Sequence, residues 1–293
     1  MSVGEQSAQA FNHYRGLLFG LAYRMLGSAT DAEDIVQEAF VRWLQAGDEK
    51  VQSPRAYLST IVTRLCINQA ESARTQREVY AGSWLPEPIS TEEMPEGADP
   101  EKHVETEESI SLAFLVLLEQ LQPFERAVFL LREVFEYEFA EIAAMLGKSE
   151  AACRRSFSRA KQHLVQRRPR FSPSPEMHRQ LLTSFLTAVQ GGDMTTLTNL
   201  LSENVVLWAD GGGKVKQAAL RPIRGREAVA RFSLGTRRFW PENAHVELEE
   251  INGQTALIIR TNGQVFSVLT IDAEQGYIQA IRIIANPDKL ARV

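Results

Sequence analysis

The sequence predicts a multidomain protein, with two all-α modules followed by an α+β domain. Apolar residues recur at helical spacing over residues 9–78 and again from 109 to about 165. The polar, proline-rich stretch RRPRFSPSP ends that pattern near residue 170. From residue 245 onward apolar and polar residues alternate, and Asn-Gly pairs separate the runs, as expected for β-hairpins.

Composition limits the possible classes of protein. The 293 residues are 44% hydrophobic, which is enough for more than one core. The net charge of −5 argues against a nucleic-acid partner, but the charge is unevenly distributed. Residues 148–170 hold eight Lys or Arg and one Glu, whereas residues 87–108 hold nine acids and one Lys. The basic segment is therefore a candidate nucleic-acid surface.

Location and cofactors can also be inferred. The start MSVGEQSAQAFNHYRG lacks a signal-peptide pattern, and the longest apolar run, around 112–118, is far shorter than the ~20 residues of a membrane span. We expect a cytosolic protein without a membrane partner. Cys66 and Cys153 fall on inward helix faces without metal-ligand spacing, so reduced packing cysteines are expected, with no metal and no cofactor.

The N-terminal helices come first in the chain. Residues 9–27 form one helix, and DAEDIVQEAFVRWLQA forms the next, with an apolar stripe made of Ile35, Val36, Ala39, Phe40, Trp43 and Leu44. Its other side carries Asp34, Gln37 and Glu38, with Asp31 in the first turn. Considered without the rest of the chain, this helix indicates only a solvated acidic face. After the loop 46–54, PRAYLSTIVTRLCINQAESARTQRE forms a long helix. Its far end carries donors suited to DNA, namely Arg64, Asn68, Arg74 and Arg77.

Residues 138–165, EFAEIAAMLGKSEAACRRSFSRAKQHLV, predict a helix, a tight turn and a second helix. Gly147 supplies a left-handed stop, and Ser149 with Glu150 can start the second helix. The inward positions of the second helix are Cys153, Phe157, Ala160 and Leu164. The opposite face carries Arg154, Arg155, Ser158 and Arg159, with Gln162. Such a face fits a DNA major groove; the alternative is a solvated basic face.

The C-terminal part predicts an α+β domain. Two helices are split at Gly191–Gly192, a further helix runs from Arg226 to about Thr236, and the strand runs include VVLWAD, HVELEEIN, TALIIRTN, GQVFSVLTID and YIQAIRIIA. We expect a curved antiparallel sheet. The evident catalytic candidates are Asp210, His245 and Trp208, whose geometry the sequence does not give, and catalysis is not expected.

Residues 79–108 contain four prolines and many acids, which indicates a flexible linker. The segment WLPEP departs from this pattern, because Trp84 and Leu85 beside Pro86 are poor choices for a solvated spacer. We expect Trp84 and Leu85 to pack against another part of the protein. DGGGK, residues 210–214, can bring its backbone close to another surface, although a long hairpin tip is the simpler interpretation.

DAEDIVQEAFVRWL with SPRAYLSTIVTRLCINQ resembles region two of the extracytoplasmic-function (ECF) sigma factors, and the helix-turn-helix resembles their region four. The resemblance implies region two at 1–78, a linker at 79–108, region four at 109–170 and a controlling domain at 171–293. It implies that Asp31, Asp34, Gln37 and Glu38 face the clamp helices of the largest RNA polymerase subunit. The flap of the second subunit is a further implied partner.

The resemblance also assigns DNA contacts. It implies that Arg64, Asn68 and Arg74 handle the melted minus-ten element of the promoter. Arg154, Arg155, Ser158 and Arg159 would read the minus-thirty-five element. Loop 46–54 would trap a flipped base, which requires an unstacked nucleotide and a pocket.

The C-terminal pattern resembles the cone-shaped SnoaL-like or nuclear-transport-factor-like fold, whose members include enzymes and binding modules. WLPEP, DGGGKV and NPDKL resemble three signatures of the SigJ-like group of ECF sigma factors. The implied regulatory residues are Trp84, Leu85, Pro86, Asp210, Gly211, Gly212, Gly213, Lys214, Asn286, Pro287, Asp288, Lys289 and Leu290. The fused domain would replace a separate anti-sigma factor and could hold an unknown small ligand.

The predicted function is that of an ECF sigma factor regulated by its own C-terminal domain. The alternative is a DNA-binding regulator fused to a small-molecule-sensing or catalytic cone domain. The acidic face at 31–38 favours the sigma factor, because a stand-alone regulator has no need of it.

Overall fold

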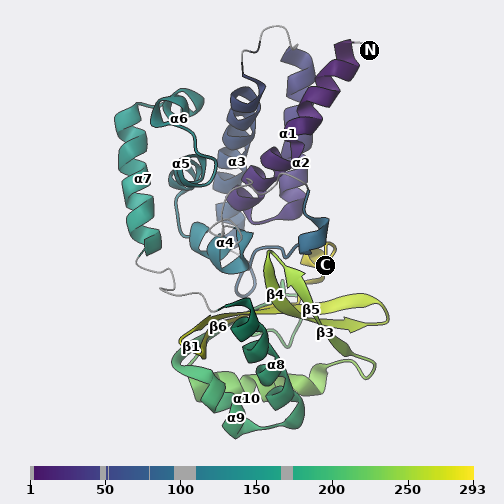
Figure 1. Ribbon diagram of the computed structural model, residues 1–293. Helices are drawn as coiled ribbons and strands as arrows, with labels where there is room; N and C mark the ends of the chain where they lie inside the picture. Colours follow the sequence, from purple (N-terminus) through teal and green to yellow (C-terminus); the bar gives the residue numbers. More distant parts are fainter. Residues whose placement is uncertain (1–2, 47–50, 52, 79, 96–109, 166–173) are drawn as a thin grey trace. The chain divides into compact units, whose positions relative to one another are not determined.

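The computed structural model describes the backbone of residues 3–46, 51, 53–78, 80–95, 110–165 and 174–293, and their side chains except those of 3–6, 73–78 and 165. The chain divides into two compact units. Unit 1 comprises Met1–Glu78 and Met94–Arg168, and unit 2 comprises Val79–Glu93 and Pro169–Val293. Unit 1 is helical in its described parts, and unit 2 contains a sheet with helices (Figure 1).

The first helices of unit 1 are α1, Val3–Leu26, α2, Ala29–Ala46, and α3, Pro54–Glu78. α1 packs against both α2 and α3. It ends where Gly27 takes a φ of 68°, a left-handed conformation that favours glycine. The ring of Trp43 on α2 is 1% exposed, and its indole N–H donates to the Ser7 carbonyl oxygen at 2.9 Å. A large apolar ring is thereby buried without leaving its donor unsatisfied.

The remaining helices of unit 1 are α4, Leu112–Leu118, α5, Pro123–Glu133, α6, Phe139–Leu146, and α7, Glu150–Val165. The predicted helix-turn-helix is confirmed in α6 and α7. α6 ends at Gly147, with φ 62° and ψ 38°, and Cys153 and Ala160 on α7 are fully buried. Phe157 stacks on Phe129 of α5 with ring centroids 6.0 Å apart, so the inward stripe of α7 packs on α5.

Polar contacts join the two sets of helices within unit 1. Arg126 on α5 is 3% exposed; it donates to the carbonyl oxygen of Met25 at the end of α1 and pairs with Glu119 at 2.6 Å. The hydroxyls of Ser59 on α3 and Tyr137 are 2.9 Å apart. Because these groups are buried, their hydrogen bonds specify how the two sets of helices meet.

Unit 2 begins with α8, Pro175–Gly191, and α9, Met194–Leu200. The predicted break between them is confirmed: Gly192 has a φ of 70°, and the Asp193 carboxylate accepts the Thr196 backbone N–H at 3.0 Å. The strands are β1, Leu201–Asp210, β2, Ile223–Arg224, β3, His245–Ile251, β4, Gln254–Thr261, β5, Gln264–Glu274, and β6, Tyr277–Ile284. α10, Arg226–Thr236, lies between β2 and β3 in the chain.

The strand order is β2-β1-β6-β5-β4-β3. β1 and β6 are parallel, with Leu207 opposite Ile281, so the expectation of a wholly antiparallel sheet is wrong at this pair. The chain leaves β1, crosses over through α10 and returns by the meander β3 to β6, which places its last strand beside its first. Parallel pairing requires such a crossover, whereas tight hairpins join only antiparallel strands.

The two predicted hairpin turns are confirmed. Asn252 and Gly253 have φ values of 53° and 72°, and Asn262 and Gly263 have values of 50° and 77°. Positive φ at both central residues is the signature of a type I′ turn, which matches the twist of the flanking strands. α8, α9 and α10 cover one face of the sheet (Figure 1), where a core forms around residues such as Leu182, Leu197 and Val229.

The segment 80–93 belongs to unit 2, and its residues 89–91 contact the end of the edge strand β3 and the turn after it. Ser90 forms a β-bridge with Ile251, and Ile89 exchanges two hydrogen bonds with Asn252, at 3.0 and 3.1 Å. The short helix η2, Thr91–Glu93, comes next, and the Thr91 hydroxyl accepts the Gly253 N–H at 3.0 Å. This part of the predicted flexible linker is therefore hydrogen-bonded to the end of β3 and to the turn that follows it.

Candidate functional sites

The exposed face of α2 carries the predicted docking residues. Asp34, Gln37 and Glu38 are exposed, and Glu38 pairs with Arg42 at 2.8 Å one turn further along. Asp31 differs from them, because it is half-buried and its charge acts on the buried Cys66 thiol. Three of the four predicted residues thus share one solvent-facing surface, and Asp31 faces the bundle.

Two apolar side chains lie on the same side of α2. Val41 is 47% exposed and Leu44 is 46% exposed. The placement of Leu44 in the buried stripe is therefore wrong. A helix turns by about 100° per residue, so Leu44 lies a full quarter-turn from the buried Trp43, at the edge of the stripe. The face that carries the carboxylates therefore also exposes two apolar side chains.

The predicted promoter residues of α3 have different surroundings. Asn68 is exposed. The Arg64 guanidinium donates through Nε to the Met145 carbonyl oxygen in the last turn of α6 at 2.8 Å, and it thereby satisfies a helix-end carbonyl. The side chain of Arg74 lies outside the described residues, as does most of the loop 46–54 that was expected to trap a base.

The outer face of α7 presents Arg154, Arg155, Ser158 and Arg159, all exposed as predicted. Arg154 pairs with Glu150 at 3.2 Å and lies 4.5 Å from the Phe139 ring centroid. Arg159 pairs with Glu125 of α5 at 2.7 Å.

Arg155 has no hydrogen-bond or ion-pair partner among the residues that the structure describes. Its guanidinium is therefore the one on this face that can bind DNA without first breaking an ion pair within the described part of the chain.

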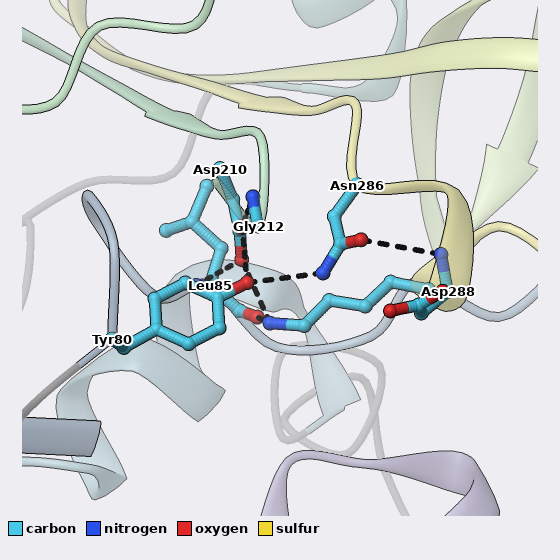
Figure 2. Close-up of polar contacts among 7 residues, drawn as sticks. Tyr80, Leu85, Asp210, Gly212, Asn286 and Asp288 are labelled. Atoms are coloured by element: carbon cyan, nitrogen blue, oxygen red, sulfur yellow. Dashed lines mark hydrogen bonds and ion pairs between the residues drawn. The ribbon is translucent and has the colours of Figure 1, made fainter. Parts of the chain in front are cut away.

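Unit 2 brings the three motifs WLPEP, DGGGK and NPDKL together around one buried carboxylate (Figure 2). We call this cluster the linker site; it comprises Tyr80, Trp84, Leu85, Asp210, Gly212, Lys214, Asn286, Asp288 and Lys289. The Asp210 side chain is fully buried and accepts four hydrogen bonds. Its donors are the Tyr80 hydroxyl at 2.6 Å, the Lys289 ammonium at 2.7 Å, the Leu85 N–H at 2.8 Å and the Gly212 N–H at 3.0 Å.

These donors explain why a carboxylate is tolerated inside the protein. A buried charge is costly unless it is paired and hydrogen-bonded, and Asp210 has both an ion pair and three further donors. Burial, together with the hydrogen bond to Asp210, raises the pKa of the Tyr80 hydroxyl above its usual range. Tyr80 therefore stays protonated and remains a donor, and Asn286 donates in turn to the Tyr80 oxygen at 3.0 Å.

Lys289 connects the C-terminal motif to the linker. Its ammonium donates to the Leu85 carbonyl oxygen and lies 4.2 Å from the centroid of the Trp84 ring. Leu85 is 2% exposed and Trp84 is half-buried, so both dock as expected. The position of NPDKL directly after the last strand predicts that Asp288, Lys289 and Leu290 project from the end of the sheet, but Pro287–Lys289 form the short helix η5, and Leu290 after it is buried.

The glycines of DGGGK allow a close approach. A Cβ on Gly212, which has a φ of 60°, would lie 2.5 Å from the Asn286 amide, and one on Gly213, with a φ of 70°, would lie 2.9 Å from the Ala81 Cβ. Any other residue would meet both strain and collision here. Lys214 has a peripheral role, because its ion pair with Asp288 at 2.6 Å is more than half exposed.

The structure does not bring the catalytic candidates together. Asp210 ends β1, whereas His245 begins β3, four strand positions away in the sheet, or about 19 Å. His245 is exposed and lies 3.5 Å from Glu247. The guanidinium carbon of the buried Arg282 lies 5.6 Å from the centroid of the Trp208 ring, and Arg282 pairs with Asp272.

Sequence reasoning missed Tyr80 and Asn252. Tyr80 precedes WLPEP in a stretch without helical or strand periodicity, and the sequence around Asn252 indicates only a turn. Their roles depend on contacts with residues more than 100 positions away, for which the sequence carries no local signal.

Among the residues that the structure describes, no helix is long and apolar enough to span a membrane, and no group of three or more His, Cys, Asp or Glu is arranged to hold a metal ion. Cys66 and Cys153 are free and buried, as predicted, and burial raises the pKa of both thiols, which suits packing and disfavours reactivity.

The helical modules match two family models of known proteins. Residues 10–76 match Sigma-70 region 2, and residues 111–164 match Sigma-70, region 4. The fold and these two matches define the class of protein as an RNA polymerase sigma factor, with helical region-two and region-four modules followed by an α+β domain.

Relatives cover the whole length of the chain. The chain is 37% identical to "ECF RNA polymerase sigma factor SigJ" of Mycobacterium tuberculosis, over 95% of this chain and 91% of the relative. It is 31% identical to "Probable ECF RNA polymerase sigma factor SigI" of the same species, over 99% and 97%. The crystal structure of SigJ from M. tuberculosis superimposes with a TM-score of 0.75 and 33% identity, covering 96% of this chain and 97% of that one. The chain belongs to the ECF family of RNA polymerase sigma factors, which serve transcription initiation and bind core polymerase and promoter DNA.

Proposed function

We propose that unit 1 supplies the polymerase and promoter contacts of this sigma factor and that unit 2 is its built-in controller in the cytoplasm. The linker site is the observation that supports the controller role most directly. The linker between the two sigma modules must be free to take the path that promoter binding requires, and in this structure residues 80–93 are held to unit 2 by Asp210, Asn252 and Lys289.

In our proposal the polymerase surface is the exposed face of α2. Asp34, Gln37 and Glu38 would face the clamp helices of the largest subunit, with Val41 and Leu44 supplying apolar contact. Exposed carboxylates beside exposed apolar side chains suit a basic partner with apolar spots, because charge steers the encounter and the apolar groups are desolvated on docking. Region four would contact the flap of the second subunit.

In the proposed promoter complex, α7 lies in the major groove of the minus-thirty-five element, and α3 handles the minus-ten element. These elements are roughly 25 base pairs apart, or about 85 Å at 3.4 Å per base pair. α3 and α6 cannot keep the hydrogen bond between Arg64 and Met145 across such a distance. We therefore infer that unit 1 opens when it binds polymerase and promoter, which frees Arg64 for DNA.

The proposed role of unit 2 is non-catalytic. The one buried carboxylate among the catalytic candidates, Asp210, already accepts four hydrogen bonds, so it has no lone pair directed at a substrate. By holding or releasing the linker, unit 2 would act in place of a separate anti-sigma factor.

The test combines polymerase binding with promoter-dependent transcription. The full chain, mixed with core polymerase, should co-elute with it and should support run-off transcription from a subset of promoters. A chain that binds duplex DNA but neither co-elutes with polymerase nor supports initiation would instead fit the alternative, a conventional DNA-binding regulator. Trp84→Ala tests the controller role separately, because it removes the ring that Lys289 packs on, and Trp84 belongs to unit 2.

A further inference from the structure

Unit 2 contains a cavity of about 100 Å³ between α8, α10 and the face of the sheet that these helices cover. The cavity wall is predominantly apolar and includes several aromatic rings. Its rings are those of Phe185, Phe232, Phe239, Trp240 and Phe266. Phe239 is 41% exposed, an unusual position for a large apolar ring, so it lies where the cavity meets solvent.

The polar groups of the cavity are all neutral. They belong to Gln217, Ser233, Thr236 and Ser267. No charged side chain lines the cavity among the residues that the structure describes. The Ser233 and Thr236 hydroxyls donate to carbonyl oxygens of α10 at 2.9 and 3.0 Å, which leaves their lone pairs as acceptors.

These features limit what the cavity can hold. An ionic ligand would lose its hydration without gaining a partner charge, whereas a neutral aromatic molecule would gain ring contacts and one or two hydrogen bonds. An apolar cavity of about 150 Å³ is known to bind benzene, and this smaller cavity opens to solvent beside Phe239, so a bound ring need not be fully enclosed. The chemistry therefore selects a neutral, ring-sized organic molecule.

The cavity shares a wall with the linker site. Ala209 and Ala285 line the cavity, and each immediately precedes a residue of the linker site, Asp210 and Asn286. The Asp210 carbonyl oxygen accepts the N–H groups of Ala285 and Asn286 at 2.8 and 3.0 Å. The ends of β1 and β6 thus carry a cavity residue and a linker-site residue side by side.

The loop after β1 forms the second connection. Val215 and Ala218 line the cavity, and a Cβ on Gly211 would lie 3.1 Å from the Val215 Cβ and 2.5 Å from the Ala218 Cβ. The Gly211 carbonyl oxygen also accepts the Lys214 and Val215 N–H groups at 2.9 and 3.1 Å. The loop is closely packed between the cavity residues Val215 and Ala218 and the glycines of DGGGK. A displacement of the loop at the cavity therefore also displaces these glycines.

We propose that this cavity binds a neutral, ring-sized aromatic molecule and that binding favours the closed linker site. The ligand contacts Val215 and Ala218 only while the loop is in the place that the closed linker site gives it. Ligand binding and linker closure are therefore positively coupled, and the coupling is reciprocal. Its consequence for transcription rests on the proposed controller role, but the coupling itself is a property of the chain without polymerase.

Binding is tested on the full chain with indole as the neutral probe and indole-3-carboxylate as its anionic counterpart, by titration calorimetry and ligand-observed NMR. Indole should bind at least tenfold more tightly than the anion. Ser267→Leu and, separately, Thr236→Met fill the cavity and should weaken indole binding at least tenfold, whereas Thr183→Leu on the exposed side of α8 should not. Absence of indole binding, or equal binding by both cavity variants with native circular dichroism, would overturn the site.

Coupling is tested by amide hydrogen exchange over residues 80–93 with and without saturating indole. Exchange should slow at least fivefold when indole is bound, the lower end of typical allosteric couplings. By reciprocity, Lys289→Met should weaken indole binding by a similar factor. Indole binding without any change in exchange would overturn the coupling, and it would leave the sigma factor function untouched because polymerase is absent from the experiment.

Discussion

Lys289→Met is the change that probes the linker site most sharply. Methionine keeps an unbranched, apolar side chain that is one atom shorter, but it removes the ammonium that pairs with Asp210, donates to the Leu85 carbonyl oxygen and lies over the Trp84 ring. Only 12% of the Lys289 side chain and none of the Asp210 side chain is exposed. Removing one partner of a buried ion pair typically costs ~3–5 kcal/mol. Because Asp210 keeps three other donors, we expect about 3 kcal/mol, at the lower end of that range.

Because each 1.36 kcal/mol changes an equilibrium constant tenfold, this loss of stability should raise the hydrogen-exchange rate about 100-fold for the amides that open with the linker site. Hydrogen exchange of the segment 80–93, and of the Leu85 amide in particular, measures it. Lys214→Met is the matched control, because its ion pair with Asp288 is exposed and should be worth at most ~1 kcal/mol. If Lys289→Met opened the segment no more than Lys214→Met does, the linker site would not be held by the buried pair.

Three further predictions concern the exposed faces of α7 and α2 and the buried His178 of unit 2. Arg155→Ala should cost ~1–3 kcal/mol of discrimination at one base pair of the minus-thirty-five element, measured as the sequence preference of the holoenzyme; equal weakening on all sequences would make Arg155 a phosphate contact. Reversing Asp34 and Glu38 to Lys should abolish association with core polymerase at unchanged stability, since both are exposed; unaltered affinity with native circular dichroism would exclude this face. Burial lowers the pKa of His178, so the unfolded chain binds its proton at higher pH than the folded chain does. Unit 2 should therefore lose thermal stability as the pH falls below about 6.5, and His178→Gln should flatten that dependence; an unchanged profile would contradict it.

The helix-turn-helix could be predicted from the sequence because its signals are local. A left-handed Gly147, a capped helix start and an inward stripe ending at Leu164 all fall within 28 residues, and the structure confirms each. The hairpins at Asn252 and Asn262 follow the same rule, since two adjacent residues decide the turn.

Features that depend on distant parts of the chain could not be predicted. The parallel pairing of β1 with β6 is decided by how the whole meander packs. The three motifs of the linker site could be singled out, but the contacts of Asp210 with Tyr80 and Leu85 span more than 100 residues. The contact of Arg64 with Met145 likewise joins residues 81 positions apart.

The central claim is that the linker site controls initiation. It is tested most directly by run-off transcription from one promoter with holoenzymes that contain the wild-type chain, Lys289→Met or Lys214→Met at equal polymerase occupancy. The account predicts that Lys289→Met changes the yield severalfold, with the sign of the change telling whether the closed site inhibits or assists initiation, and that Lys214→Met matches the wild type. Equal yields from all three holoenzymes, with the segment 80–93 shown by hydrogen exchange to be open in Lys289→Met, would contradict it.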